Sequence, residues 1–407
     1  MAVLRCAIVG VSGYGAAHLG AAQLLEREGL LTLQAVAEVF PQRCRQELGE
    51  LGSRGVRIYS DYGAMLHRER ALDIVCIPTP IHLHTPMALA CFERGLHVLL
   101  EKPPAALVQD VGRMLGAAQG RGRLCQVGFQ SIADPTAVEL KARLATGAIG
   151  GLKEIVVRGY WRRTDGYYAR TGWAGKLRLG SDWVLDGPAN NPLCHYIHQA
   201  LFLACPRERD TLRPLAVQAE LYHAHPIEGE DILCGRAELE GGAVLLSYLT
   251  LCAPQSNAPT VSIVGEKGTA FWTPGHWALD GAGGRASGDA SPEGTTALLR
   301  NLVRAVAADQ ELCSPLAATR NVILHNNGCF KSTGRIWPVP AEKVRRCVSD
   351  KEGERGEVAT EVDGLIEAME RAAAERRMLS EIGVAWAVRT RKVALDFDSF
   401  DPSPLLG

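Results

Sequence analysis

The stretch CAIVGVSGYGAAHL, Cys6–Leu19, joins an apolar run to a helical pattern through a turn with three glycines, Gly10, Gly13 and Gly15. A pyrophosphate binds where backbone N–H groups at a helix N-terminus face it without intervening side chains. Gly10 permits the tight turn and Gly15 permits close helix–strand packing, whereas Ser12 replaces the middle glycine of the G-x-G-x-x-G fingerprint. The stretch predicts a dinucleotide-binding turn, and an ordinary glycine-rich turn is the alternative.

The next apolar run, LTLQAVAEV, ends at Glu38. A carboxylate about 20 residues beyond such a turn accepts hydrogen bonds from the adenine-ribose hydroxyls and repels a 2′-phosphate. Glu38 therefore favours NAD over NADP. The alternative is a solvated carboxylate with no role in binding.

Short apolar runs alternate with helical segments as far as about residue 130. The runs VLRCAIVG, LTLQAVAEV, LDIVCIPT, HVLLEK and CQVGFQ are continuously apolar, which is typical of strands covered on both faces. Strands that alternate with helices form a parallel sheet with right-handed crossovers. Residues 1–130 are therefore predicted to form a doubly wound Rossmann domain that binds NAD.

Beyond residue 130 the strands follow one another with few helices between them. LEGGAVLLSY, residues 239–248, predicts a hairpin with Gly-Gly at its turn. We expect residues 131–340 to form an α+β domain with an open, mostly antiparallel sheet. The glycine-rich segment 280–294 predicts a mobile loop, and residues 341–407 predict a C-terminal extension that is helical around 361–377.

The composition is that of a globular protein, with 47% hydrophobic and 22% charged residues among 407. A formal net charge of −1 provides no broad field for nucleic acid or an anionic membrane. No apolar stretch reaches the roughly 20 residues of a membrane span, and the N-terminus lacks a signal-peptide layout. The 12 cysteines include no C-x-x-C pair, so we interpret them as core residues of a cytoplasmic protein.

A charged pair, Glu101 and Lys102, follows the apolar run in HVLLEKPPAA, His97–Ala106. The preceding strand ends in PTPIHLH, residues 78–84, and ligands bind at the carboxyl edge of such a sheet. A lysine there can hydrogen-bond a substrate hydroxyl and help relay its proton. Glu101 would hold the lysine or the cofactor, and Pro103 would fix the turn. A surface ion pair beside a turn is the alternative.

Polar residues also recur in DGPANNPLCHYIHQALFLA, residues 186–204. Asn191 followed by proline predicts a helix N-cap, and Asn191, His195 and His198 would then share one helix face. A histidine can take a proton as a hydride leaves the same carbon. No third ligand accompanies His195 and His198, so no metal is predicted, and a structural role for His198 is the alternative.

The segment before it, residues 159–186, mixes aromatic and basic residues with glycines. Such a mixture suits stacking on sugar faces and hydrogen bonding to hydroxyls. Tyr168 and Trp173 are therefore predicted to bind substrate. The alternative is a loop whose aromatic residues anchor it to the core.

The combination of GVSGYGAAH, Glu38, PTPIHLH and EKPPA resembles the Gfo/Idh/MocA oxidoreductase family, named for glucose-fructose oxidoreductase and inositol dehydrogenase. The resemblance runs through residues 1–200 and continues more weakly to about 340. It implies an N-terminal NAD(P) domain and a C-terminal open-sheet domain that often forms the oligomer interface. A homodimer or homotetramer is therefore expected.

The resemblance also implies roles for single residues. Lys102 corresponds to the catalytic lysine, and Gln130 resembles a position near the nicotinamide. The family pattern Asp-x-x-x-His-x-x-Asp reads Asn191, His195 and His198 in this chain. His195 would then be the general base, while Asn191 could orient the substrate without accepting a proton.

These observations predict an NAD-dependent dehydrogenase that oxidises a secondary hydroxyl of a sugar, glycoside or cyclitol. The predicted catalytic residues are Lys102, His195 and Asn191. The predicted substrate-binding residues are Lys102, Tyr168, Trp173, Asn191, His195 and His198. The predicted cofactor-binding residues are Gly10, Ser12, Gly13, Tyr14, Gly15, Glu38, Arg43, Pro78, Thr79, Pro80, His84, Glu101, Lys102 and Gln130.

Two other functions remain open at this stage. A redox-neutral NAD-dependent glycosidase or epimerase would act through a transient keto-sugar and return the hydride to its substrate. A non-catalytic sensor would bind NAD only to signal. The retained Lys102 and His195 argue against the sensor.

Overall fold

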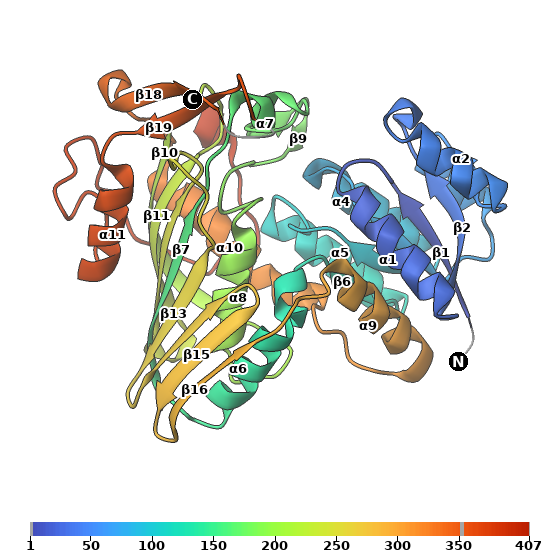
Figure 1. The fold of residues 1–407 in the computed structure, drawn as a ribbon, viewed down its shortest axis with the longest axis horizontal. Helices are drawn as coiled ribbons and strands as arrows, with labels where there is room; N and C mark the ends of the chain where they lie inside the picture. The colour runs from blue at the N-terminus through green and yellow to red at the C-terminus, as the bar shows by residue number, and fades with distance from the viewer. Residues whose placement is uncertain (1–2, 351–353, 407) are drawn as a thin grey trace. The chain divides into compact units, whose positions relative to one another are not determined.

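The computed structural model describes residues 3–350 and 354–406, which fall into two compact units (Figure 1). The first unit comprises Met1–Ala105, Asp110–Asp134 and Pro292–Thr319. The second comprises Ala106–Gln109, Pro135–Ser291 and Arg320–Gly407. No helix within the described residues is long and apolar enough to cross a membrane.

The first unit contains a six-stranded parallel sheet with the order β3-β2-β1-β4-β5-β6, so the predicted doubly wound fold is confirmed. The sequence pattern missed only the edge strand β3, which has three residues and buries none of them fully. The strands are β1 (Leu4–Val9), β2 (Leu31–Ala37), β3 (Arg57–Tyr59), β4 (Ile74–Ile77), β5 (His97–Leu100) and β6 (Cys125–Val127). The helices of this unit are α1 (Gly15–Arg27), α2 (Arg45–Ser53), α3 (Tyr62–Arg68), α4 (Ile81–Glu93), α5 (Val108–Gly120) and α9 (Thr295–Ala308). The first two residues of α5 are grouped with the second unit.

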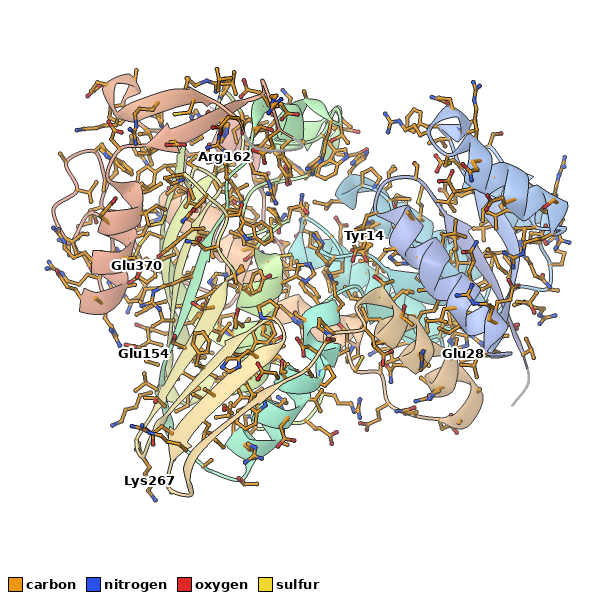
Figure 2. All side chains as sticks on the ribbon, viewed as in Figure 1. Tyr14, Glu28, Glu154, Arg162, Lys267 and Glu370 are labelled. Atoms are coloured by element: carbon orange, nitrogen blue, oxygen red, sulfur yellow. The ribbon has the colours of Figure 1, made fainter. Side chains whose placement is uncertain are left out.

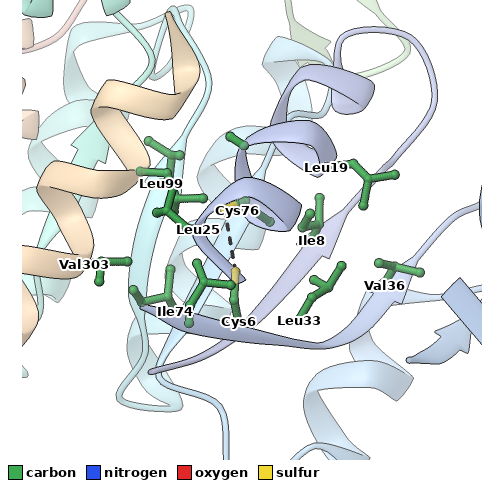
Figure 3. Packing of buried hydrophobic residues seen from close by; sticks show 14 of the residues in the cluster. Cys6, Ile8, Leu19, Leu25, Leu33, Val36, Ile74, Cys76, Leu99 and Val303 are labelled. Atoms are coloured by element: carbon green, nitrogen blue, oxygen red, sulfur yellow. Dashed lines mark hydrogen bonds between the residues drawn. The ribbon is translucent and has the colours of Figure 1, made fainter. Parts of the chain in front are cut away.

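The core of the first unit joins side chains from β1, β2, β4 and β5 to the apolar faces of α1 and α9 (Figure 3). The thiols of Cys6 and Cys76 meet there at 4.0 Å without a disulfide. All twelve cysteines lie in the described part of the chain and are free, and all but Cys313 and Cys347 are buried. This confirms the interpretation of most of them as small core residues.

Helix α9 belongs to the first unit although it follows most of the second in sequence. Its residues Leu298, Leu299, Leu302 and Val303 are buried in the core of the first unit. Gln126 of β6 donates to the Leu298 carbonyl at 3.2 Å and to Asn301 Oδ1 at 2.8 Å. The predicted boundaries at residues 130 and 340 therefore differ from the observed units, because an amphipathic pattern does not reveal which core its apolar face joins.

Replacing Gly15 with alanine is expected to lower the free energy of unfolding by at least about 2 kcal/mol, measured by urea denaturation. A Cβ on Gly15 would lie 2.2 Å from the Gly10 carbonyl oxygen, a backbone atom that cannot rotate away. Gly20 provides the control, since a Cβ there meets nothing within 4 Å. Gly20→Ala is expected to stabilise the protein by about 0.5–1 kcal/mol. Similar unfolding midpoints for both variants would contradict the predicted clash.

The second unit is built on a ten-stranded sheet with the order β16-β15-β14-β13-β7-β12-β11-β10-β17, and β20 pairs with β10. All pairs are antiparallel except β7–β12 and β10–β17, which confirms the predicted open, mostly antiparallel sheet. The strands are β7 (Leu152–Tyr160), β10 (Pro214–His223), β11 (Ile232–Leu239), β12 (Val244–Thr250), β13 (Thr260–Gly265), β14 (Thr269–Thr273), β15 (His276–Gly281), β16 (Gly284–Asp289), β17 (Trp337–Pro338) and β20 (Val393–Ala394).

Helices cover both faces of this sheet because side chains alternate along each strand (Figure 1). Val156 and Tyr160 of β7 pack in one core with residues of α11 (Leu365–Glu375). On the opposite face, α8 (Cys194–Ala204) packs on β7 and β13 and also contacts α6 (Pro135–Ala145). Gly159 allows this approach, since a Cβ there would lie only 3.0 Å from the Leu193 side chain.

The two predicted turns of this sheet had different outcomes. The Gly-Gly hairpin is confirmed, with Gly241 at φ +82° and Gly242 at φ +87° between β11 and β12. The predicted mobile loop at 280–294 is wrong, because β15 and β16 pair as a hairpin through much of it. β16 lies at the sheet edge and buries none of its side chains fully, so no apolar pattern marks it.

The C-terminal segment belongs to the second unit. Helix α11 lies within the stretch 361–377 that the sequence predicts to be helical, and before it β19 (Val358–Val362) pairs with β18 (Val344–Val348), two strands that were not predicted. Arg162 donates to Glu361 Oε1 at 2.8 Å and so ties this hairpin to the segment after β7 (Figure 2). Helix α10 (Leu316–Thr333) was not predicted.

Candidate active site

The glycine-rich turn lies between β1 and α1, as its sequence requires. Gly10 has φ +90° and Gly13 has φ +58°, which are conformations that favour glycine. Ser12 is half-buried and Tyr14 is exposed. Helix α1 begins at Gly15, so the turn leads into a helix N-terminus of the kind that binds phosphate.

Glu38 follows β2 directly and is buried beside this turn. Its Oε2 accepts hydrogen bonds from the backbone N–H groups of Val11 and Ser12, both at 3.0 Å, and its Oε1 accepts one from Phe40 at 2.9 Å. Burial alone would raise the pKa of Glu38, but these donors outweigh it and the pKa is lowered. The carboxylate is therefore held ionised at the position where a dinucleotide fold recognises ribose.

Arg43 lies close to Glu38 in the sequence, at the end of a short helical turn, Pro41–Arg43. It is exposed, and its guanidinium carbon lies 4.5 Å from the centre of the Phe40 ring. The residues of the turn, Glu38 and this stacked pair fit an adenosine group, with planar surfaces beside a ribose-binding carboxylate.

Pro78, Thr79 and Pro80 connect β4 to α4, which begins at Ile81. His84 is fully buried, with Nδ1 2.8 Å from the Pro103 carbonyl oxygen and Nε2 2.7 Å from that of Thr79. Burial lowers the pKa of its ring. The buried His84 ring therefore links the turn after β4 to the turn after β5. The sequence predicted His84 as a cofactor-binding residue.

Glu101 is buried at the end of β5 and is held from two sides. His18 Nε2 lies 3.0 Å from Glu101 Oε1, and the backbone N–H of Lys102 donates to Oε2 at 3.1 Å. A Cβ on Gly128 would lie 2.5 Å from Oε1, so this position also requires glycine. Glu101 thereby fixes the backbone of the half-buried Lys102. Sequence reasoning missed His18, whose only signal is its place on the buried face of α1.

Gln130 and Tyr14 meet at the same edge of the sheet. Gln130 Nε2 donates to the Tyr14 hydroxyl at 3.3 Å, and that hydroxyl lies 3.3 Å from Thr295 Oγ1. The turn after β6 is thus linked to the N-terminus of α1. The first unit therefore collects the glycine-rich turn, Lys102 and Gln130 at the carboxyl ends of β1, β5 and β6.

In the second unit, Asn191 precedes α8 instead of capping it. The helix begins at Cys194 after Leu193, so the predicted N-cap is wrong. The Asn191 side chain instead donates from Nδ2 to Asp186 Oδ1 at 2.8 Å, and Asp186 Oδ2 accepts from Gly175 N–H at 2.6 Å. Asp186, which sequence reasoning missed, therefore fixes the orientation of the Asn191 amide.

His195 and His198 have different environments although both lie on α8. His195 is half-buried, whereas His198 is fully buried. Burial, with a smaller contribution from the charge of Lys141, lowers the pKa of His198 to about 3. Lys141 donates to the carbonyls of Phe202 and Cys205. His198 is thus a neutral interior residue, which matches the structural alternative better than the predicted contact with substrate.

The stability of the protein is expected to depend on the ionisation of His198. In the unfolded chain, His198 binds a proton as the pH falls below its ordinary pKa of 6.5. In the folded protein, the same side chain stays neutral down to about pH 3. Stability is therefore lost as the pH falls through this window. His198→Gln should lose about 1–2 kcal/mol less than the wild type between pH 7 and pH 5, measured by urea denaturation. The exposed His67→Gln is the control, and equal losses in all three proteins would contradict the assignment.

Tyr168 and Trp173 of the aromatic segment have different surroundings. Trp173 is half-buried, with the Arg170 guanidinium carbon 5.8 Å from its ring centre. The Tyr168 ring lies 4.7 Å from that of His225, and its hydroxyl oxygen is buried. The hydroxyl of Tyr168 therefore faces the interior of the second unit.

Comparison with known proteins places the two units in one family. Residues 4–129 match the family model described as "Oxidoreductase family, NAD-binding Rossmann fold", and residues 137–271 match the GFO/IDH/MocA C-terminal domain. Inositol 2-dehydrogenase 4 of Saccharopolyspora erythraea is 34% identical over 148 residues, which are 36% of this chain and 42% of that protein. Inositol 2-dehydrogenase of Rubrobacter xylanophilus is 33% identical over 160 residues, 39% of this chain and 44% of the relative. The alignment thus spans less than half of these curated relatives.

Solved structures resemble the chain over most of its length. Levoglucosan dehydrogenase in complex with NADH and levoglucosan has a TM-score of 0.71 at 19% identity, covering 82% of this chain and 97% of that one. The WlbA dehydrogenase of Bordetella pertussis in complex with NADH and UDP-GlcNAcA has a TM-score of 0.69 at 22% identity, with the same coverage. At these identities the likeness shows the fold, while the family matches together span more than half of the 407 residues. The chain therefore belongs to the Gfo/Idh/MocA family of oxidoreductases, with an NAD-binding Rossmann domain at its N-terminus.

Proposed function

We propose that this protein is an NAD-dependent dehydrogenase that oxidises a secondary hydroxyl of a sugar, glycoside or cyclitol. One observation carries the proposal: Glu101, bound by His18 and by the Lys102 backbone, sets Lys102 at the same sheet edge as the glycine-rich turn. The inositol dehydrogenases and the levoglucosan dehydrogenase among the similar proteins support this substrate class.

The proposed chemistry divides the work between cofactor and side chains. Bound NAD supplies the hydride acceptor. The Lys102 ammonium donates a hydrogen bond to the substrate oxygen and stabilises the negative charge that develops there. His195 accepts the hydroxyl proton, and Asn191, whose amide is oriented by Asp186, positions a neighbouring hydroxyl.

The experiment is a screen of the purified protein with NAD against inositols, free sugars, anhydrosugars and aryl glycosides, followed by NADH absorbance. We expect NADH to form with at least one polyol or sugar, in equal amount to the ketone product. Release of the aglycone from an aryl glycoside without net formation of NADH would show that the protein is a redox-neutral glycosidase instead of a dehydrogenase. Binding of NAD with no turnover of any compound in either assay would leave the sensor and overturn the proposal.

The choice of NAD over NADP is part of the proposal and rests on Glu38. Glu38→Gln is expected to weaken NAD binding about tenfold, since a hydrogen bond to a charged group contributes about 1.5–3 kcal/mol. The preference for NAD over NADP, measured as the ratio of the two affinities, should fall as well, because the neutral amide no longer repels the 2′-phosphate of NADP. Titration of NADH and NADPH fluorescence measures both, with thermal unfolding as the check on folding. An unchanged ratio would contradict the role of Glu38.

A further inference from the structure

Three side chains that the proposed function does not use converge inside the second unit. His225 and Asp231 belong to the connection between β10 and β11, and Cys252 follows β12. All three are buried, and their nitrogen, oxygen and sulfur atoms lie within 4.8 Å of one another. His225 Nδ1 is 2.8 Å from Asp231 Oδ2 and 3.6 Å from Cys252 Sγ.

The hydrogen-bond partners of the His225 ring are compatible with metal binding. Nδ1 lies 2.8 Å from Asp231 Oδ2, and Nε2 lies 3.3 Å from the carbonyl oxygen of Arg163, which only accepts. With a cation on Nδ1, Nε2 would keep its proton and donate it to that carbonyl. A ring whose second N–H donates to a backbone carbonyl is also the usual form of a metal-bound histidine.

A fourth polar residue, Tyr168, packs against the cluster. The Tyr168 ring lies 4.7 Å from the His225 ring, and its hydroxyl is buried without a hydrogen-bond partner among the described residues. An unsatisfied buried hydroxyl costs about 1–3 kcal/mol, and a ligand bound at the cluster would relieve that cost if it reached the hydroxyl.

We infer that His225, Asp231 and Cys252 bind one divalent transition-metal ion, with zinc the best match, and that Tyr168 borders its fourth position. Nitrogen, oxygen and sulfur together suit zinc, whereas magnesium and calcium prefer oxygen alone. A tetrahedral zinc site separates its sulfur and nitrogen ligands by about 3.5 Å, close to the 3.6 Å between Cys252 and His225. The 2.8 Å contact of His225 with Asp231 is a hydrogen-bond distance, and it would open by roughly 0.5 Å as the metal replaces protons.

The ion would join three separate pieces of chain. The cluster lies where the aromatic segment, the β10–β11 connection and the end of β12 meet, so metal binding would stabilise their packing rather than take part in hydride transfer. The inference is therefore independent of the proposed function, and its readouts need no substrate.

Metal content is the first test. The protein is produced without a histidine tag in zinc-supplemented medium, and its metals are measured by mass spectrometry. We expect about one zinc ion per chain in the wild type and less than about a tenth in Cys252→Ser. Cys234→Ser is the matched control, because Cys234 is equally buried on β11 but lies outside the cluster, and it should retain the ion.

Two measurements on the wild type do not depend on how the variants fold. Removal of the metal by a chelator should lower the melting temperature, and added zinc should restore it. Cobalt in place of zinc should give a thiolate-to-metal charge-transfer band in the near ultraviolet, absent in Cys252→Ser. Metal-free wild-type protein that neither zinc nor cobalt changes would overturn the inference and leave an imidazolium–carboxylate pair beside a thiol. Zinc retained in Cys252→Ser would place the ion elsewhere and overturn it equally.

Discussion

Lys102→Met is expected to lower kcat by about a thousandfold while the dissociation constant of NAD changes by less than about threefold. The ammonium group acts on the substrate oxygen only as charge develops there, so its removal raises the barrier without removing a contact that holds the dinucleotide. General acid–base and electrostatic groups of this kind contribute about 10²–10⁴-fold. Methionine keeps the length and apolar stem of lysine, which isolates the loss of charge.

Steady-state kinetics and NADH fluorescence titration separate these two effects. Lys153→Met, at an exposed position on β7, is the control and should behave as the wild type. Lys102→Arg keeps the charge but not the compact ammonium, and it should recover only part of the activity. A Lys102→Met enzyme that retains half of the wild-type kcat, or that loses NAD binding in proportion to activity, would remove Lys102 from the proposed chemistry.

His195→Asn is expected to lower kcat/KM by about 10²–10⁴-fold and to abolish the acidic limb of its pH profile. Asparagine can hydrogen-bond a hydroxyl but cannot accept its proton, so binding should suffer less than turnover. His198→Gln, three residues along the same helix but fully buried, should stay within a few-fold of the wild type. A His195→Asn variant that kept a wild-type pH profile would show that another group takes the proton.

The double variant Lys102→Met/His195→Asn tests whether the two side chains act in the same chemical step. Groups that act as a unit lose little more together than the worse single change. We therefore expect the double variant to lie within about tenfold of the slower single variant. Fully multiplicative losses would show that the two side chains act in separate steps.

The parts of the fold that could be predicted are those in which local sequence and burial agree. Five of the six strands of the first unit are marked by continuous apolar runs, because helices cover both faces of that sheet. The glycine-rich turn and Glu38 could also be predicted, because each depends on the identity of single residues. A positive φ favours glycine, and the carboxylate at the end of β2 is visible in the sequence.

The parts that could not be predicted depend on partners far away in the sequence. The amphipathic pattern of α9 does not tell that its leucines join the first unit. The hairpin of β15 and β16 forms through backbone pairing, to which glycine, serine and alanine contribute no visible pattern. Asn191 followed by proline predicts a helix cap, but the carboxylate of Asp186 binds that side chain instead. His18 was missed because a buried histidine on a helix has no sequence signal until Glu101 is known to lie beside it.

The return of Pro292–Thr319 to the first unit has a consequence for how the protein is made. When the ribosome has completed the six parallel strands, the leucines of α9 that finish their core are not yet translated. At about 5–20 residues per second, the sheet would wait on the order of ten seconds or more with an apolar face open to water. The newly made N-terminal third is thus expected to bind chaperones, and an isolated fragment that stops at Asp134 should aggregate unless the α9 segment is supplied to it.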